Sequence, residues 1–474
     1  MEQISTTYSN LKITPYQLIN VQEFYLVKQL NDHTRLRFTA VVPEELKDTY
    51  VDMTKFDSPV GISQLAEDGT EVPLFSGTVL AIEVKAVRDV YYLEVEAVSH
   101  TYRLDVRPQS RSFQDKNMKV DELLRRISLL YPSLDIMDSA TGGASIGRMW
   151  VQYRETDWAF LKRLASYYHT SLMPAAIFDT PKFYFGIEES GTAVQLDNYH
   201  YTVSKRISAY RYFAGNDTAS VDEQDFLDYT VETEQVLELG NEIQFRGKTL
   251  YVYEAQTRMT QGVLLHTYTL TTHKGLRQKA YYNEQLTGLS LEGKVIAVER
   301  DRVKVHLDID PEQDKNTAHW FPYATGYSAE GHSGWYVMPE LGDKVRIYFP
   351  NQHDDEGIAS SSVRQDRGDG GHNHLKHPDV KIFRTPHGKE IRLTPDEVVI
   401  TGKDGAVFIK LNQGDGIHMV SNKDIHFSAG GNIHMEAGQK VTISAGQEIN
   451  LSSRSSHITL GGDTSVVGSE VKTN

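Results

Sequence analysis

Two carboxylates, Glu155 and Asp157, have the residue type and the close spacing that acid–base chemistry requires. Polysaccharide hydrolases use such a pair, with one side chain as the acid and the other as base or nucleophile. The surrounding residues favour a structural role. Thr156 is a natural helix N-cap, Asp157 suits the positive end of the helix that follows, and no histidine or second acidic cluster lies nearby in sequence. Since no convincing pair is found elsewhere, we expect this chain not to be an enzyme.

A second candidate is a phosphate-binding loop. Gly240 and the run Gly247-Lys248-Thr249 resemble one, but six residues separate the glycines where the motif has four. The flanking residues 236–239 and 249–252 read as two strands, whereas a nucleotide site needs a strand followed by a helix N-terminus. We therefore expect no nucleotide and no other cofactor.

Histidines are the third candidate. His372, His374 and His377 are close enough to share a metal ion, but they lie in a glycine-rich linker that would hold a site poorly. A second series, His418 and its equivalents eight and sixteen residues later, falls between inward-pointing positions and so faces solvent. We expect no metal site in either group.

The most regular element of the chain is an eight-residue repeat near its C-terminal end. Apolar residues recur at the first and third positions of each repeat, and these predict one constant face of short strands. The positions are Ile409, Leu411, Ile417, Met419, Ile425, Phe427, Ile433, Met435, Val441, Ile443, Ile449 and Leu451. Residues that tolerate positive φ follow in phase at Gly414, Asn422, Gly430, Gly438 and Gly446. Such a period predicts a β-solenoid whose unit is a strand, a corner and a second strand.

Eight residues are too few to enclose a core. A strand of ~4 residues spans only ~13 Å, which is one side of a prism. One chain taking three repeats per coil would give a stub of about two coils. Three chains each supplying one side would instead give a needle that lengthens by ~4.8 Å per repeat. We favour the homotrimer, in which the twelve apolar positions form a shared core.

The end of such a needle exposes unpaired backbone groups and apolar side chains, which another protein must cover. Beyond the last repeat, Ile458 and Leu460 precede a short tail that holds Val466 and Val467 but has too few residues for a folded cap. We expect a separate tip protein to dock on these four residues.

Composition excludes several other classes of protein and partner. The net charge of the 474 residues is −15, which argues against nucleic acid as a partner, and cysteine is absent. The N-terminus lacks a secretion signal, and no apolar run approaches the ~20 residues that span a bilayer.

The order of elements predicts a mainly β fold with some helix. Residues 1–282 read as two β-barrel subdomains with inserted helices, among them a helix whose apolar face holds Val120, Leu123, Leu124, Ile127 and Leu130. Residues 283–365 hold five short strands that suit an OB-type barrel acting as a structural adaptor. Residues 366–378 form a linker, and residues 379–474 form the trimeric β-helix needle with its tip.

Two motifs, in this order with the octads, resemble the VgrG family, the spike proteins of type VI secretion systems. Residues 152–164 are similar to the family's Gln-Tyr-x-Glu-Ser/Thr-Asp-x-x-Phe-Leu-x-Arg-Leu passage, and residues 339–345 to its Pro-x-x-Gly-Asp-x-Val. The resemblance spans nearly the whole chain. It departs from some phage spikes in having no lysozyme-like insert after the barrel, and no effector domain follows the needle.

The resemblance implies a non-enzymatic, phage-hub-like homotrimer that caps the inner tube of a contractile machine and punctures a target membrane transiently. The implied partners are the tube ring protein at the hub base, a PAAR-type tip protein, and effector or adaptor proteins. The spike would wait in the bacterial cytoplasm and be injected without a signal peptide. A phage tail or phage-derived particle is the alternative setting, and a cell-wall or polysaccharide hydrolase on a spike scaffold is a third hypothesis.

Overall fold

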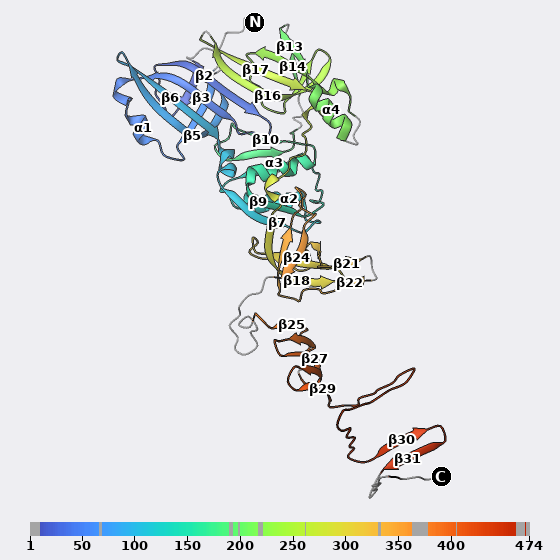
Figure 1. The fold of residues 1–474 in the computed structure, drawn as a ribbon. Helices are drawn as coiled ribbons and strands as arrows, with labels where there is room; N and C mark the ends of the chain where they lie inside the picture. Colours follow the sequence, from blue (N-terminus) through green and yellow to red (C-terminus); the bar gives the residue numbers. More distant parts are fainter. Residues whose placement is uncertain are drawn as a thin grey trace. The chain divides into compact units, whose positions relative to one another are not determined.

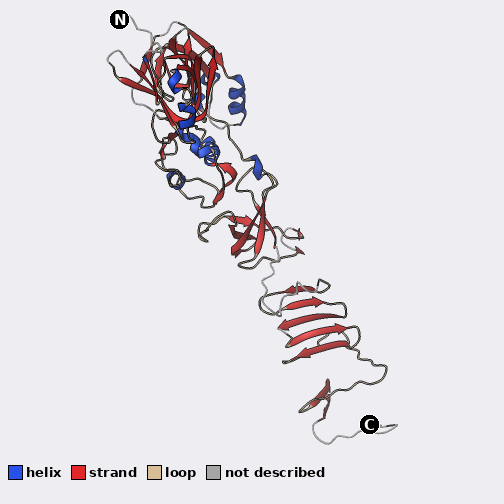
Figure 2. Ribbon diagram, turned by 90° about the vertical axis from the view of Figure 1, so that its left-hand side faces the viewer, coloured by secondary structure: helices blue, strands red, loops and turns tan. Residues whose placement is uncertain are grey.

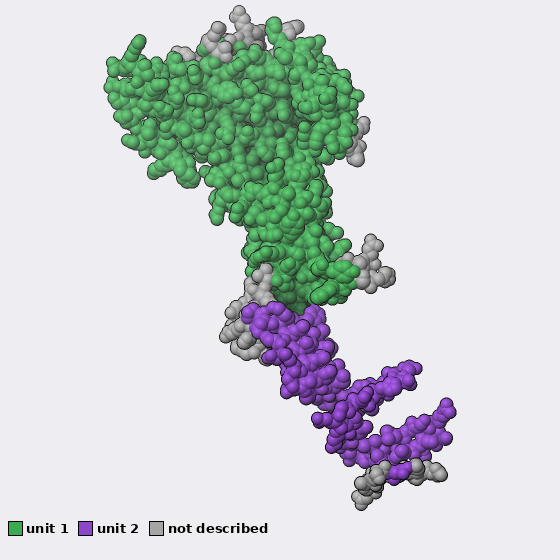
Figure 3. All heavy atoms as spheres, viewed as in Figure 1, with its two compact units in different colours: residues 1–364 green, residues 365–474 purple. Residues whose placement is uncertain are grey.

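The computed structural model describes residues 10–65, 69–188, 193–197, 200–216, 221–260, 262–329, 333–362, 378–403, 405–460 and 470. Their fold is mainly β. The chain divides into two compact units, residues 1–364 and residues 365–474 (Figure 3). The predicted linker histidines His372, His374 and His377 lie outside the described residues. Within the described part, no helix is both long and apolar enough to cross a membrane.

The first unit is built around a twelve-stranded sheet, counted over the described residues (Figure 1). Its N-terminal half consists of β1 (Leu11–Thr14), β2 (Asn20–Gln29), β3 (Arg35–Val42), β4 (Pro59–Leu65), β5 (Glu71–Val87) and β6 (Val90–Ser99). Its second half consists of β12 (Val194–Leu196), β13 (Tyr201–Lys205), β14 (Leu227–Thr233), β15 (Glu242–Phe245), β16 (Lys248–Thr260) and β17 (Val263–Thr271). Along the main path the order is β1-β4-β5-β6-β3-β2-β16-β17-β14-β13. Outside this path, β15 pairs with β16, and β12 pairs with β15.

The sequence predicts two β-barrel subdomains within residues 1–282, and strand pairing connects the two halves of this sheet. Strand β2 pairs with β16 in antiparallel register, from Tyr25 opposite Arg258 to Gln29 opposite Glu254. Each half keeps its own hydrophobic core, one around Phe38 and the other around Tyr268. The halves are therefore two cores under one sheet, because main-chain pairing continues across their border.

Short-range features of this sheet agree with the sequence. The hairpin predicted across Arg88 and Asp89 is confirmed, since Val87 pairs with Val90 and both turn residues have positive φ. The segment that resembled a phosphate loop is the β15–β16 hairpin, with Phe245 opposite Lys248. Strand follows strand there, as predicted.

In sequence, a helical layer lies between the two halves of this sheet. It contains α2 (Val120–Ser128) and α3 (Asp157–Tyr167) with the strands β7 (Pro108–Phe113), β8 (Asp135–Asp138), β9 (Trp150–Thr156), β10 (Leu172–Pro174) and β11 (Lys182–Phe185). Four of the five residues predicted for the apolar face of α2 are buried, but Leu130 is half exposed because the helix ends at Ser128. Two further helices, α1 (Thr49–Met53) and α4 (Ile207–Asn216), were not predicted. The short 3-10 helices are η2 (Glu44–Leu46), η3 (His100–Asp105), η4 (Glu223–Phe226), η5 (Lys274–Leu276) and η6 (Glu284–Leu286).

The first unit ends in a small barrel. Its strands are β18 (Ser290–Glu299), β19 (Arg302–Leu307), β20 (Trp320–Pro322), β23 (Lys344–Tyr348) and β24 (Ile358–Ser362), with β21 (Ser328–Ala329) and β22 (Ser333–Gly334) as a separate hairpin. The order β20-β19-β18-β23-β24 leaves β20 and β24 at the edges, and a parallel bridge from Tyr323 to Ala359 joins those edges. Buried Val303, Phe321 and Ile347 fill its interior.

The second unit contains a sheet in which each strand pairs with the next one along the chain (Figure 2). The strands are β25 (Lys381–Arg384), β26 (Glu390–Leu393), β27 (Glu397–Lys403), β28 (Val407–Asn412) and β29 (Gly416–Ser421). After residues 422–448, which have no strand, β30 (Ile449–Ser453) and β31 (Ser456–Leu460) form a hairpin.

A buried histidine in the first unit predicts a pH-dependent stability. Burial, together with the nearby Lys28 charge, lowers the pKa of His266 to about 4. Its imidazole contacts the Thr257 hydroxyl at 2.8 Å between Nδ1 and Oγ1. Because the pKa is lower in the folded protein, the stabilisation is complete above the unfolded pKa of ~6.5 and is lost as the pH falls toward 4. We expect a loss of about 2 kcal/mol between pH 7 and pH 5.

Urea denaturation monitored at pH 7 and pH 5 measures this loss. The His266→Gln variant retains a hydrogen-bonding side chain but does not titrate, so its midpoint should shift less between the two pH values. Equal shifts for the two proteins would contradict the assignment.

Candidate functional site

The VgrG-like motif begins at the junction of β9 and α3. The Thr156 side chain accepts a hydrogen bond from the Ala159 amide at 3.2 Å, so the predicted N-cap is confirmed. The cap ends the strand and starts the helix at one point, which brings Glu155 at the end of β9 beside Arg163, two turns into α3. The spacing of Glu155, Thr156 and Arg163 in the motif therefore matches the geometry of a strand that turns directly into a helix.

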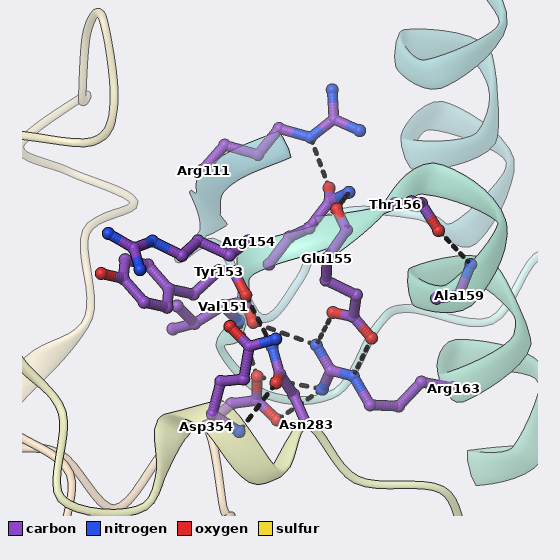
Figure 4. Close-up of polar contacts among 12 residues, drawn as sticks. Arg111, Val151, Tyr153, Arg154, Glu155, Thr156, Ala159, Arg163, Asn283 and Asp354 are labelled. Carbon is purple, nitrogen blue, oxygen red and sulfur yellow. Dashed lines mark hydrogen bonds and ion pairs between the residues drawn. The ribbon is translucent and has the colours of Figure 1, made fainter. Parts of the chain in front are cut away.

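Arg163 is the centre of the motif's polar contacts (Figure 4). Its guanidinium is 2% exposed and donates to Glu155 and to Asp354, each at 2.9 Å, and to the Val151 carbonyl at 3.0 Å. Asp354 also accepts the Val151 amide at 2.7 Å. Asp354 belongs to the loop between β23 and β24, so Arg163 ties the helical layer to the barrel.

The charges in this network depend on one another. Burial opposes the positive charge of Arg163, but Asp354 and Glu155 outweigh burial and raise its pKa. Burial raises the pKa of Glu155, and the attraction of Arg163 opposes that rise. The cluster of Arg163, Glu155 and Asp354 has a formal net charge of −1, and the attraction of the arginine to both carboxylates stabilises it in the interior.

Asp157 has a partner of its own. It forms an ion pair with Arg111 of β7 and accepts hydrogen bonds from the Gln152 amide and from the Tyr131 hydroxyl, the latter at 2.6 Å. Burial and the Asp157 contact raise the pKa of Tyr131. Both carboxylates that were considered for catalysis are therefore held by arginines, which is the arrangement of a structural junction.

Two further contacts connect the helical layer to the barrel. Asp310 accepts the Ser112 amide at 2.6 Å and its hydroxyl at 2.5 Å, and Gln114 donates to the Val305 carbonyl at 3.1 Å. Asp310 and Asp354 were not predicted from the sequence to take part in this junction. Their partners lie about 200 residues away in the chain, and a single sequence holds no local signal for that pairing.

The polar junction has no metal-site character. Among the described residues, no group of three or more histidines and carboxylates is arranged to hold a metal ion. His418 lies on the face of β29 opposite to Ile417 and Met419, as its place in the repeat predicted.

The predicted core residues on β28 and β29 share one face of their sheet. Ile409 pairs with Met419, and Leu411 pairs with Ile417. The same face continues onto β27, where Ile400 lies opposite Ile409. We call this set the apolar stripe, and it extends to Val398, Ile391 and Leu393 through the β26–β27 register. The stripe lacks cover in the single chain, because nearly all of these side chains are more than one-third exposed.

The other predicted core residues are also uncovered in one chain. They lie in residues 422–448 and on β30, namely Ile425, Phe427, Ile433, Met435, Val441, Ile443, Ile449 and Leu451. Exposure across the predicted core reaches 75% at Met435. On the terminal hairpin, Ile458 lies opposite Leu451 and Leu460 opposite Ile449. Val466 and Val467 of the predicted tip lie outside the described residues.

The repeat differs from its prediction in two respects. Between residues 397 and 421, one octad is a single strand plus a turn, and it pairs with the next octad of the same chain. The predicted unit had two strands. At the connection between β28 and β29, the residue with positive φ is Gly416, the first residue of β29, and not the predicted Gly414.

Comparison with known proteins rests on structure alone. No protein-family model matches the chain, and no curated protein matches its sequence. The E. coli c3393 protein, described as a type VI secretion component with similarity to the T4 bacteriophage tail proteins gp27 and gp5, has 15% identity and a TM-score of 0.52 over 75% of this chain and 99% of its own.

Chains of PdpA–VgrG complexes give two further matches. The half-lidded Francisella complex has 8% identity and a TM-score of 0.55 over 84% of this chain and 83% of its own. The lidless complex has 8% identity and a TM-score of 0.51, covering 84% and 93%. The fold is thus one found in components of type VI secretion. Within that class it is VgrG-like, which confirms at the level of the fold the resemblance that the motifs indicated.

The buried network leads to a stability prediction. Replacing Arg163 with methionine leaves Glu155 and Asp354 buried without a cation, and we expect a loss of about 3–5 kcal/mol in the free energy of unfolding. Urea denaturation measures this loss. Arg126→Met is the matched control, because its ion pair with Glu122 is exposed, and it should cost less than about 1 kcal/mol.

Neutralising the two carboxylates tests the same network from the other side. Adding Glu155→Gln and Asp354→Asn to Arg163→Met should recover part of the lost stability, since no buried charge is then uncompensated. If Arg163→Met is as mild as Arg126→Met, the network does not stabilise the junction.

Proposed function

We propose that this chain is the subunit of a homotrimeric, non-enzymatic spike in a contractile injection machine of the type VI secretion kind. The observation that carries this proposal is the apolar stripe. A monomeric soluble protein rarely leaves a long, continuous apolar face in water, and each fully buried large aliphatic side chain contributes ~1.5–3 kcal/mol. Three copies related by a threefold axis would cover one another's stripes with the same residues in each chain.

The position of the stripe supports a needle more than a compact trimer. It runs across successive strands from β26 to β29, so its length grows with every repeat. Continuing the same register through residues 422–460 in the assembled protein would extend the core to the end of the described chain. A rigid rod of paired strands is suited to transmit an axial force, and the force itself would come from the rest of the machine.

The proposed partners follow from this object. The hub, residues 1–282, would cap a ring of the tube protein, and the OB-type barrel would connect it to the trimeric β-helix. A PAAR-type tip protein would cover Ile458, Leu460, Val466 and Val467, and effector or adaptor proteins would travel with the spike. The chain would reside in the bacterial cytoplasm, then enter the medium or a target cell through a briefly punctured membrane. A contractile phage tail would use the same object.

One pair of variants tests the trimer. Ile417→Asp places three carboxylates in the proposed core, where each unpaired charge costs several kcal/mol, so we expect the trimer to dissociate. His418→Asp adds the same charge at the adjacent position on the opposite face and should leave the trimer intact.

Light scattering coupled to size exclusion gives the readout. The unmodified chain and His418→Asp should have three times the 53.6 kDa chain mass, and Ile417→Asp should have a lower mass. A monodisperse, folded monomer for the unmodified chain would refute the spike proposal.

A further inference from the structure

One residue of the VgrG-like motif takes no part in the buried junction. The other polar residues around it have side-chain partners inside the first unit, namely Gln152, Glu155, Thr156 and Asp157. Arg154 is exposed, and its guanidinium forms no ion pair or hydrogen bond with the described residues. Figure 4 shows its side chain pointing away from Arg163. The motif therefore presents one arginine to the surroundings of the chain.

The backbone at Arg154 suits glycine better than arginine. Strands β7 and β9 pair with a register shift, in which Gln109 lies opposite Glu155 and Ser110 opposite Tyr153. Arg154 is therefore the extra residue of a β-bulge, and its φ is 47°, in the left-handed region. Glycine reaches this conformation without the penalty that a Cβ carries, so the backbone does not explain an arginine at this position.

The bulge holds the Arg154 side chain over an aromatic ring. Its guanidinium carbon lies 5.4 Å from the centre of the Tyr153 ring. A cation over an aromatic face keeps its charge, and the planar fork of arginine still offers paired N–H groups to a carboxylate. The Tyr153 carbonyl accepts a hydrogen bond from Asn283 at 3.0 Å, which fixes the backbone that supports the ring. Arg154 is thus positioned in advance of binding, which lowers the cost of ordering it.

The charges around this arginine favour an acidic partner. Arg107, which precedes β7, is also exposed and forms no ion pair with the described residues. The two carboxylates of the motif, Glu155 and Asp157, are paired with other arginines. Asp105, close to Arg107 in sequence, accepts the Thr156 hydroxyl. The β7–β9 ribbon therefore exposes cations in a chain whose net charge is −15, and such a surface is complementary to an acidic one.

We propose that the bulge at Arg154 is a recognition site for a carboxylate on a short acidic segment of a separate protein that the spike carries. A nucleic acid would need a long track of cations, whereas a short acidic segment needs only this ribbon. Arginine and tyrosine are also the residue types that dominate the binding energy of protein interfaces. The inference rests on the proposed spike for the occupant, an effector or adaptor protein, and adds the chemistry that would hold it.

Replacing Arg154 with glycine separates recognition from structure. Glycine suits the positive φ, so the variant should unfold at the same urea concentration as the unmodified chain or at a higher one. Loss of a charge-assisted contact should weaken the binding of an acidic peptide by about tenfold or more. The probe is a fluorescein-labelled hexaglutamate peptide, whose fluorescence anisotropy is measured with the full-length protein. No binding to the unmodified chain, or unchanged affinity in the variant, would overturn the proposal.

Arg88→Gly is the matched control. Arg88 is exposed, has a φ of 51° and lies between β5 and β6, so this variant removes the same charge from a similar backbone conformation. Its affinity for the peptide should change by less than about twofold. An equal loss in both variants would mean that net charge alone attracts the peptide, and the site would be refuted. If Arg154→Gly alters the circular dichroism spectrum, Arg154→Asn repeats the test, because asparagine also tolerates positive φ.

Two further measurements distinguish the occupants. Tighter binding of a single-stranded oligothymidylate than of hexaglutamate, lost with Arg154→Gly, would overturn the choice of a carboxylate. In light scattering, a trimer that dissociates with Arg154→Gly would place the contact between copies of this chain and would also overturn the proposal. A monomeric unmodified chain would refute the spike, and the peptide titration on that sample would still show whether the carboxylate site exists.

Discussion

The constraint on which this molecule depends is that the sheet of its second unit has an apolar face that the described residues leave exposed. Ile409, Leu411, Ile417 and Met419 lie on one face by register, and that face is open to solvent in a single copy. Main-chain pairing links consecutive strands from β25 to β29, but their apolar side chains on this face remain exposed. Since burial of apolar surface is the main favourable term in association, covering this face would drive the proposed assembly.

The first unit meets a different requirement. Each of its parts has a buried core, and buried polar contacts join the parts in addition to apolar ones. Arg163 donates hydrogen bonds to two carboxylates and a carbonyl. A shift of the barrel relative to the helical layer would therefore break some of these bonds. Replacing such a network with apolar residues often stabilises a protein, so its value here is better sought in the fixed geometry than in stability. A spike that transmits force between a hub and a needle needs that fixed geometry.

Local patterns were sufficient for much of the fold. The eight-residue spacing predicted the shared face of β28 and β29, but the strands that it predicted within residues 422–448 are not formed in the structure. The Thr156 cap, the β5–β6 hairpin and most of the α2 face followed from short stretches. Features that depend on distant residues were not predictable in this way. The pairing of β2 with β16 joins residues more than 200 positions apart, and Asp354 meets Arg163 across 191 positions. Helix α4 was missed because its sequence has a weak apolar period, with Phe213 its one buried residue.

The two units therefore divide the work of specifying one assembly. Burial of the apolar stripe would contribute much binding free energy but little specificity. Each repeat presents a similar apolar face, so two copies can pair in registers that differ by one repeat. Charged rims discriminate but contribute little energy in water. In the proposed trimer, the needle would supply the affinity, and the hub, whose residues do not repeat, would fix which sides of neighbouring copies meet. Register in the needle could then be set from the hub end, where the contacts do not repeat.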